Sequence, residues 1–156
     1  MVVLHPMSET DFAGFLAYFI PDYAAEIAAN YHLSQDEALV QAKREIASSL
    51  PDGVKTQGQS LKSIVHTENG SEVQIGYLWY RANGEDKSAF IYDFYLLPAF
   101  RGKGLGSRAM QSLEALLAGE GIRQIKLRVA AENAHAKKVY EANGYQVTGY
   151  NMNKLL

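Results

Sequence analysis

A glycine-rich junction near the middle of the chain is the stretch best suited to chemistry. Residues 90–97 have the apolar content of a strand, and three glycines at alternate positions follow: Gly102, Gly104 and Gly106. Glycines let the main chain approach a ligand closely, and the free N–H groups of a following helix carry the positive end of its dipole. Arg101 and Lys103 add full positive charges. The junction therefore predicts a phosphate-binding site rather than an ordinary helix start.

Three phosphate-binding chemistries use such glycines, and two of them fit poorly. The Walker pattern G-x-x-x-x-G-K-S/T is absent. Residues 104–109, GLGSRA, match the dinucleotide pattern G-x-G-x-x-A. That fingerprint requires several β-α-β units and an acidic residue after the next strand, whereas only one unit can be drawn here and Arg128 stands in the run KLRV. Nicotinamide or flavin binding is therefore disfavoured.

The elements around the junction predict an α/β domain. The N-terminal part reads as a strand at 2–4, a helix from Ser8 to about 19 that Pro21 interrupts, a helix at 22–30, and a helix capped by Ser34. Alternating apolar residues and Asn-Gly turns predict an antiparallel meander; its strands are 61–67, 73–80 and 90–97. The remaining elements expected are a helix at 103–118, a strand at 124–129 parallel to 90–97, a helix at 133–143, and one or two strands at 145–155.

The composition narrows the class of protein. A length of 156 residues fits one domain, and the formal charge of −2 argues against nucleic-acid binding. Cysteine is absent, which excludes disulfides, thiolate metal sites and cysteine nucleophiles. The four histidines have no metal-ligand spacing, so no metal is expected. Because no apolar run resembles a signal peptide or a membrane span, we expect a cytoplasmic protein without membrane contact.

Two motifs about thirty residues apart resemble those of one known family. Residues 101–106, RGKGLG, fit the pattern Q/R-x-x-G-x-G/A of the GNAT superfamily of acyl-CoA-dependent N-acetyltransferases. The second motif of that family is similar to Asn133 with a small residue three positions on, then Tyr140, then Gly144 followed by the aromatic Tyr145. The resemblance covers residues 60–156 well, and before them it extends only to the order of a strand followed by helices.

The resemblance implies a single domain over residues 1–156. Its three layers, α/β/α, would enclose a mixed, mostly antiparallel sheet that splays between two parallel central strands, with acetyl-CoA bound at about 90–145. The main-chain groups of residues 95–97 would be free to pair with the pantetheine arm, and the N–H at Leu96 would polarise the thioester carbonyl. Tyr140 would protonate the departing thiolate. The residues implied at acetyl-CoA are Tyr95, Leu96, Leu97, Arg101, Gly102, Lys103, Gly104, Leu105, Gly106, Ser107, Asn133, Ala136, Lys137 and Tyr140.

Asp93 is the best side-chain candidate for the general base that an amine acceptor needs. It shares one strand face with Tyr95 and Leu97, and an acid within IYDFY is unusual without a role or a partner. A simple ion pair with a neighbouring basic residue is the alternative. Polyamine-acetylating relatives often have Glu immediately before this Asp, where this chain has Tyr92, so a polyamine acceptor is weakened and a water-relayed base stays open.

Helices at about 8–50 would form the acceptor side. The acids and aromatics able to hold an ammonium group there are Asp22, Tyr23, Glu26, Tyr31, Trp79 and Tyr80. The function expected is direct transfer of the acetyl group from acetyl-CoA to a primary amine, on a small molecule or a peptide, in a ternary complex. The alternative is a catalytically silent acyl-CoA-binding domain. Whether the chain forms a homodimer is left open.

Overall fold

The computed structural model describes all residues from Met1 to Leu156 as a five-stranded sheet with four α-helices. The strands are β1 (Val2–Pro6), β2 (Ser60–Glu68), β3 (Ser71–Asn83), β4 (Ser88–Leu96) and β5 (Gln124–Leu127). The helices are α1 (Glu9–Tyr31), α2 (Gln35–Ser49), α3 (Leu105–Gly119) and α4 (Ala134–Ala142), with short 3-10 turns at Gly53–Lys55 and Pro98–Phe100. Every predicted helix region and the predicted meander are therefore confirmed.

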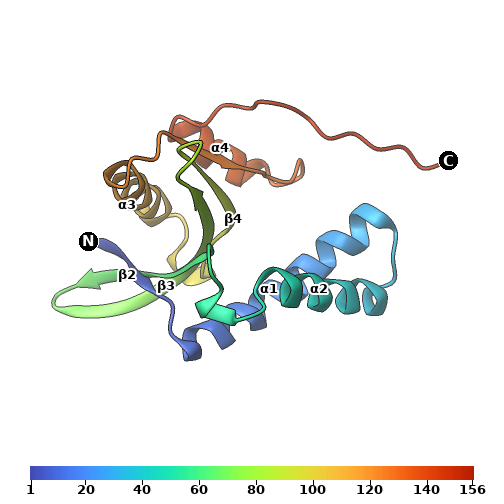
Figure 1. Ribbon diagram of the computed structural model, residues 1–156, viewed down its shortest axis with the longest axis horizontal. Helices are drawn as coiled ribbons and strands as arrows, with labels where there is room; N and C mark the ends of the chain where they lie inside the picture. Colours follow the sequence, from blue (N-terminus) through green and yellow to red (C-terminus); the bar gives the residue numbers. More distant parts are fainter.

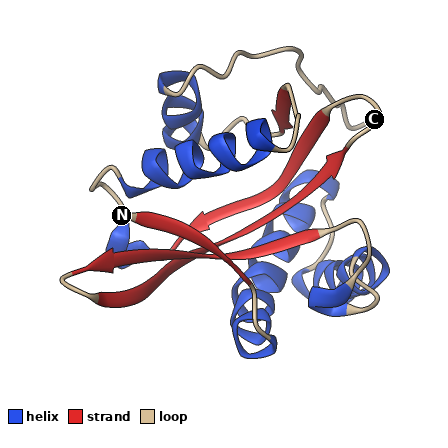
Figure 2. Ribbon diagram, turned by 60° about the vertical axis from the view of Figure 1, so that its left-hand side comes forward, coloured by secondary structure: helices blue, strands red, loops and turns tan.

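The sheet is mixed and mostly antiparallel, as expected. Its strands lie in the order β1-β2-β3-β4-β5, and Figure 2 shows the long strands crossing the molecule as a twisted ribbon. Neighbours are antiparallel except β4 and β5, which are parallel because α3 forms the crossover between them. Their pairing ends at Ile91 and Leu127, so the rest of β4 has no neighbour on that side.

Helices cover both faces of the sheet because β3 is apolar on both faces. Tyr77 and Trp79 pack with α1 and α2, while Leu78 and Tyr80 pack with α3 in a second core. This alternation follows from the two-residue period of a strand. In Figure 1, α1 and α2 lie at the lower right and α3 and α4 at the upper left, with β4 between them. The structure confirms the three-layer α/β/α arrangement.

Helices α1 and α2 begin at the two N-cap serines that the sequence predicts. The Ser8 hydroxyl accepts from the Asp11 N–H at 3.0 Å, and the Ser34 hydroxyl accepts from the Glu37 N–H at 3.1 Å. Each bond satisfies one of the four N–H groups that lack a partner inside the helix. Sequence alone therefore locates both starts.

One prediction about α1 is wrong, since Pro21 does not interrupt it. The helix continues for 23 residues, although a proline in the interior removes one main-chain hydrogen bond. Packing outweighs this cost because Phe15 before the proline and Ala24 and Ile27 after it are all buried. Neither this helix nor any other is long and apolar enough over 18 residues to cross a membrane.

The predicted final strand at 145–155 is also wrong. Tyr145 is partly buried against the α3 core, and the chain after it follows an extended, exposed path away from the sheet (Figure 1). No residue after Gly144 has a strand partner. An extended segment becomes a strand only through ladder hydrogen bonds with a neighbour.

Candidate active site

A cavity of about 630 Å³ separates α1 and α2 from the end of β4, the segment after β5, and α4. Its size lies in the range of small-molecule sites. Fifteen of its 23 lining residues are hydrophobic. The polar and titratable side chains among them are Tyr18, Asp22, Tyr23, Glu26, Glu45, Ser49, Gln59, Tyr92, Asp93, Tyr95, Arg128, Asn133 and Tyr140.

A β-bulge in β4 turns two successive side chains toward this cavity. Tyr80 pairs with Ile91 and Trp79 pairs with Asp93, so Tyr92 is the extra residue. Its ring stacks on that of Trp79 with centroids 4.7 Å apart, and both Tyr92 and Asp93 line the cavity. A regular strand would place Asp93 on the same face as Ile91, which is buried in the α3 core. The bulge therefore moves the carboxylate to the α1 face.

Asp93 has a hydrogen-bond partner that the sequence did not identify. The Tyr18 hydroxyl lies 2.6 Å from both carboxylate oxygens of Asp93, and the Tyr18 ring stacks on that of Tyr95 with centroids 3.6 Å apart. Burial raises the pKa of Asp93 to about 7, the Tyr18 hydrogen bond opposes this rise, and the charge of Asp22 adds to it. Burial and the Asp93 charge raise the pKa of Tyr18. Asp93 is thus paired with a neutral donor and not with a basic residue.

Tyr140 lies on the opposite wall of the same cavity. It belongs to α4, which begins with the Asn133 side chain accepting from the Ala136 N–H at 3.2 Å. Asn133, Ala136 and Tyr140 all line the cavity, as their helical spacing predicts, while Lys137 does not. Burial, with a contribution from the charge of Asp93, raises the pKa of Tyr140 to about 12. The tyrosine therefore keeps its proton at neutral pH.

The unpaired edge of β4 offers main-chain groups beside these side chains. The Leu97 N–H donates to the Ile75 carbonyl at 2.8 Å, so the expectation that Leu97 offers a free N–H is wrong. In an antiparallel strand, the backbone N–H and C=O groups of successive residues point to alternate sides. The backbone groups of Tyr95 therefore point toward β3, like those of Leu97, and the backbone groups of Leu96 point toward the splayed side. The Leu96 carbonyl there accepts from Arg101 Nε at 2.9 Å. Leu96 is therefore the residue whose N–H faces the opening.

The glycine junction fits a negatively charged group. Gly102 and Gly104 have φ of +75° and +77°, and no atom lies within 4 Å of where a Cβ would be. No side chain caps the N-terminus of α3. Its first main-chain hydrogen bond is donated by the Arg108 N–H to the Gly104 carbonyl. The N–H groups of residues 105–107 thus have no partner within the helix, an arrangement that binds anions. The Asn143 amide donates to the Ser107 hydroxyl at 3.0 Å, which ties the end of α4 to this junction.

The acceptor-side predictions divide into two groups. Asp22, Tyr23, Glu26 and Trp79 line the cavity. Tyr31 lies at the end of α1 with 67% of its surface exposed, and Tyr80 is buried against α3 on the other face of the sheet. Neither of these two tyrosines lines the cavity.

Tyr18 and Glu45 are titratable cavity residues that were not predicted. Tyr18 precedes Asp22 and Glu26 by one and two helical turns, so the helical period was a signal that could have found it. Glu45 comes from α2, and only the packing of that helix against α1 brings it to the cavity.

The chain is similar to known acetyltransferases over its whole length. Residues 27–145 match the model of the Acetyltransferase (GNAT) family. The uncharacterized N-acetyltransferase YycN of Bacillus subtilis is 35% identical over 158 residues, which cover 99% of each chain. A crystal structure of that YycN superposes with a TM-score of 0.90 at 34% identity, covering 100% of this chain and 99% of the other. The uncharacterized N-acetyltransferase YdgE of the same organism is 30% identical, covering 98% of this chain and 97% of its own. The chain therefore belongs to the GNAT family of acetyltransferases and is an acyltransferase.

Proposed function

We propose that the protein transfers an acetyl group from acetyl-CoA directly to a primary amine, with both substrates bound at once. The observation that carries this proposal is the placement of Asp93 and Tyr140 on facing walls of one cavity, beside the unpaired end of β4. A proton acceptor and a proton donor within one cavity suit acyl transfer, which must remove one proton and deliver another.

Asp93 is the proposed general base. An amine is nucleophilic only without its extra proton, and a carboxylate with a pKa of about 7 is matched to remove that proton near neutral pH. Its position on the α1 face directs it toward the acceptor side of the cavity. Tyr18 holds the carboxylate in place through its hydrogen bond.

Tyr140 and Leu96 are the proposed partners of the thioester end. When bound, acetyl-CoA supplies the acetyl thioester, whose C–S bond breaks as the C–N bond of the product forms. The Tyr140 hydroxyl donates its proton to the departing sulfur, which agrees with its raised pKa. The Leu96 N–H donates a hydrogen bond to the thioester oxygen as negative charge develops there.

The glycine junction is the proposed site for the pyrophosphate of acetyl-CoA. Its free N–H groups, with Arg101 and Lys103 beside them, supply positive charge at one end of β4. The acidic residues of the cavity all lie away from this junction, on α1, α2 and β4. The residues thus separate an anion-binding end from an acidic end, as a phosphate-bearing donor and an amine acceptor require.

Release of free CoA tests the proposal directly. The protein is incubated with acetyl-CoA and a panel of primary amines, and a thiol reagent detects CoA without background because the chain has no cysteine. We expect CoA release that depends on the amine. Binding of acetyl-CoA without turnover of any amine would contradict the proposal and favour a silent binding domain.

The variant Tyr140→Phe tests the assignment of the acid. Since it removes only the hydroxyl, kcat should fall by about 100-fold while the KM for acetyl-CoA changes little. Tyr150→Phe is the matched control, because Tyr150 is 82% exposed in the C-terminal segment. Full activity of Tyr140→Phe across the pH range would show that another group protonates the sulfur.

A further inference from the structure

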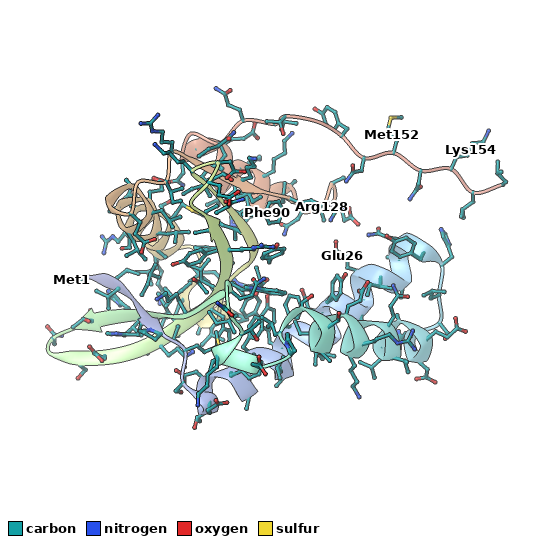
Figure 3. All side chains as sticks on the ribbon, viewed as in Figure 1. Met1, Glu26, Phe90, Arg128, Met152 and Lys154 are labelled. Atoms are coloured by element: carbon teal, nitrogen blue, oxygen red, sulfur yellow. The ribbon has the colours of Figure 1, made fainter.

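The wall of the cavity opposite α4 is strongly acidic. Four carboxylates line the cavity: Asp22, Glu26, Glu45 and Asp93. Arg128 is the one cationic side chain among the lining residues, and its guanidinium lies 3.1 Å from Glu26. Figure 3 shows Arg128 and Glu26 facing one another between the segment after β5 and α1. The other three carboxylates, Asp22, Glu45 and Asp93, form no salt bridge.

The two acids of α1 that line the cavity follow Tyr18, the partner of the proposed base Asp93, along one face of the helix. Tyr18, Asp22 and Glu26 are spaced by four residues and lie on one face of the helix. Because a helix rises 1.5 Å per residue, successive members stand about 6 Å apart. Tyr18 contacts Asp93, and the charge of Asp22 raises the pKa of both residues. Asp22 is therefore the next carboxylate along the cavity after Asp93.

Glu45 supplies an independent sign of a missing ligand. The Tyr23 hydroxyl is the neutral neighbour of this carboxylate, whose charge adds to burial in raising the pKa of Tyr23. The Oε2 atom of Glu45 nevertheless has no solvent contact and no hydrogen-bond partner, although the residue lines the cavity. Buried polar atoms in proteins almost always have a partner, and leaving one without a donor costs about 1–3 kcal/mol. A positively charged donor entering the cavity would satisfy this oxygen. The other carboxylates would gain from the same charge.

Aromatic rings enclose the space between these acids. Phe19, Tyr23, Trp79 and Tyr92 line the cavity, with Phe19 and Tyr23 stacked at 5.5 Å and Trp79 and Tyr92 stacked at 4.7 Å. Ring faces attract ammonium groups and pack against methylene chains. The walls thus suit an elongated molecule with cationic ends and an aliphatic middle.

We infer that the acceptor is a small aliphatic diamine, since Asp22, Glu26 and Glu45 supply the acidic groups of the cavity although position 92 holds a tyrosine and not the Glu that often precedes this Asp in polyamine-acetylating relatives. One amino group lies at Asp93 and is acetylated, while the second stays protonated and is bound by Asp22 and Glu45 among the aromatic rings. The first nitrogen loses its ammonium proton to Asp93 before attack and a second proton as its C–N bond forms and the thioester C–S bond breaks. One proton ends on the CoA sulfur and the other in solvent, so the monoacetylated product keeps one positive charge on the second nitrogen. This inference rests on the proposed function, because it assigns the acceptor of the same cavity. It disfavours acceptors with a single amino group and anionic acceptors.

Kinetics with a matched pair of amines tests the inference. 1,4-Diaminobutane and butylamine have the same four-carbon chain and differ only in the second amino group. We expect kcat/KM to be at least about tenfold higher for the diamine, corresponding to one charge-assisted contact. In Asp22→Asn and Glu45→Gln this ratio should fall toward one. The control Glu141→Gln, an exposed acid of α4 outside the cavity, should leave the ratio unchanged.

A binding measurement tests the preference of the cavity for a diamine even without turnover. Trp79 is the single tryptophan of the chain and lines the cavity, so its fluorescence reports occupancy. We expect 1,4-diaminobutane to change the emission saturably at concentrations at least about tenfold below those of butylamine, and less so in Asp22→Asn. Equal responses to the two amines, or equal ratios in Asp22→Asn and the wild type, would overturn the inference. Failure of CoA release with every amine would instead refute the proposed function, and the Trp79 titration would still accept or reject the diamine.

Discussion

Two opposing effects act on the carboxyl group of Asp93. Burial and the neighbouring charge of Asp22 disfavour its ionised form, whereas the hydroxyl of Tyr18 stabilises that form by a hydrogen bond. The resulting pKa of about 7 lies midway between an inert buried acid and an ordinary surface carboxylate. Reactivity at this position thus depends on contacts between α1 and β4.

The pH dependence of the rate should report the ionisation of Asp93. A base must lose its own proton first, so kcat should increase as the pH rises through about 7 and then level off. In Asp93→Asn, kcat should fall by about 100-fold or more and the inflection should disappear. Steady-state CoA release between pH 5.5 and 9 measures both. An inflection near 7 that persists in Asp93→Asn would assign it to another group, the acceptor amine included.

Tyr18→Phe should move this inflection to higher pH. Without the hydroxyl the ionised carboxylate loses a charge-assisted hydrogen bond, so the pKa of Asp93 rises by about one to two units. Activity at pH 7 should fall about tenfold and recover toward the wild-type value at pH 9. The ionisation of the acceptor amine affects the wild type and Tyr18→Phe equally, so it cancels in the ratio of their rates at each pH. If that ratio is the same at every pH, Tyr18 has only a structural role.

At the scale of elements, three local interruptions of regular structure create the site. The bulge at Tyr92 turns Asp93 toward α1, and the glycine junction leaves α3 without a side-chain cap. The separation of β4 from β5 leaves Leu96 without a strand partner on the β5 side. Gly76 lets β3 approach β4 closely beside the site, because a Cβ there would lie 2.0 Å from the Tyr95 carbonyl oxygen. Irregular backbone at these points is thus part of the site.

Gly104→Ala should weaken acetyl-CoA binding and stability together. A residue with a Cβ at φ of +77° costs about 1–2 kcal/mol, and relief of that strain would redirect the N–H groups of the first turn of α3. We expect a lower urea midpoint and a several-fold higher KM for acetyl-CoA. Gly84→Ala is the control, since Gly84 lies outside the site, has no positive φ and has open space around it. An unchanged KM in Gly104→Ala would argue against pyrophosphate binding at this junction.

At the scale of the whole molecule, the cavity separates the two helical layers and brings an acid into the protein interior. The folded protein holds the proton of Asp93 up to a pH of about 7, whereas an unfolded chain releases it near 3.8. Below both values the group has no effect on stability. Between them the unfolded state loses its proton first, so stability falls as the pH rises, and above 7 the full cost remains.

Asp93→Asn should therefore stabilise the protein at high pH while it abolishes most activity. The cost of ionised Asp93 is on the order of 4 kcal/mol at pH 8, from about three pKa units at 1.36 kcal/mol each. Urea unfolding should show a higher midpoint for Asp93→Asn at pH 8 and nearly equal midpoints at pH 4. A wild-type advantage at pH 8 would show that Asp93 is not a destabilising acid.

Sequence patterns identified most helices and strands, and in the candidate site they identified the glycine junction and the α4 residues. The caps at Ser8 and Ser34, the glycine junction, and the spacing of Asn133 and Tyr140 are local signals, so they do not depend on distant parts of the chain. Family membership followed from the motifs at 101–106 and 133–145. Long-range packing keeps α1 helical through Pro21, where the local sequence predicted a break. The segment after Gly144 is not a strand, because no other strand pairs with it.

The sequence by itself determined that a strand, a glycine junction and a helix follow one another, because glycine conformation and helix ends are local properties. Only the tertiary structure decided what surrounds the carboxylate of Asp93. Tyr18 is 75 residues away along the chain, and Glu45 belongs to a different helix. The bulge that brings these groups together depends on the register between β3 and β4, which is set by pairing across strands and not by either strand alone.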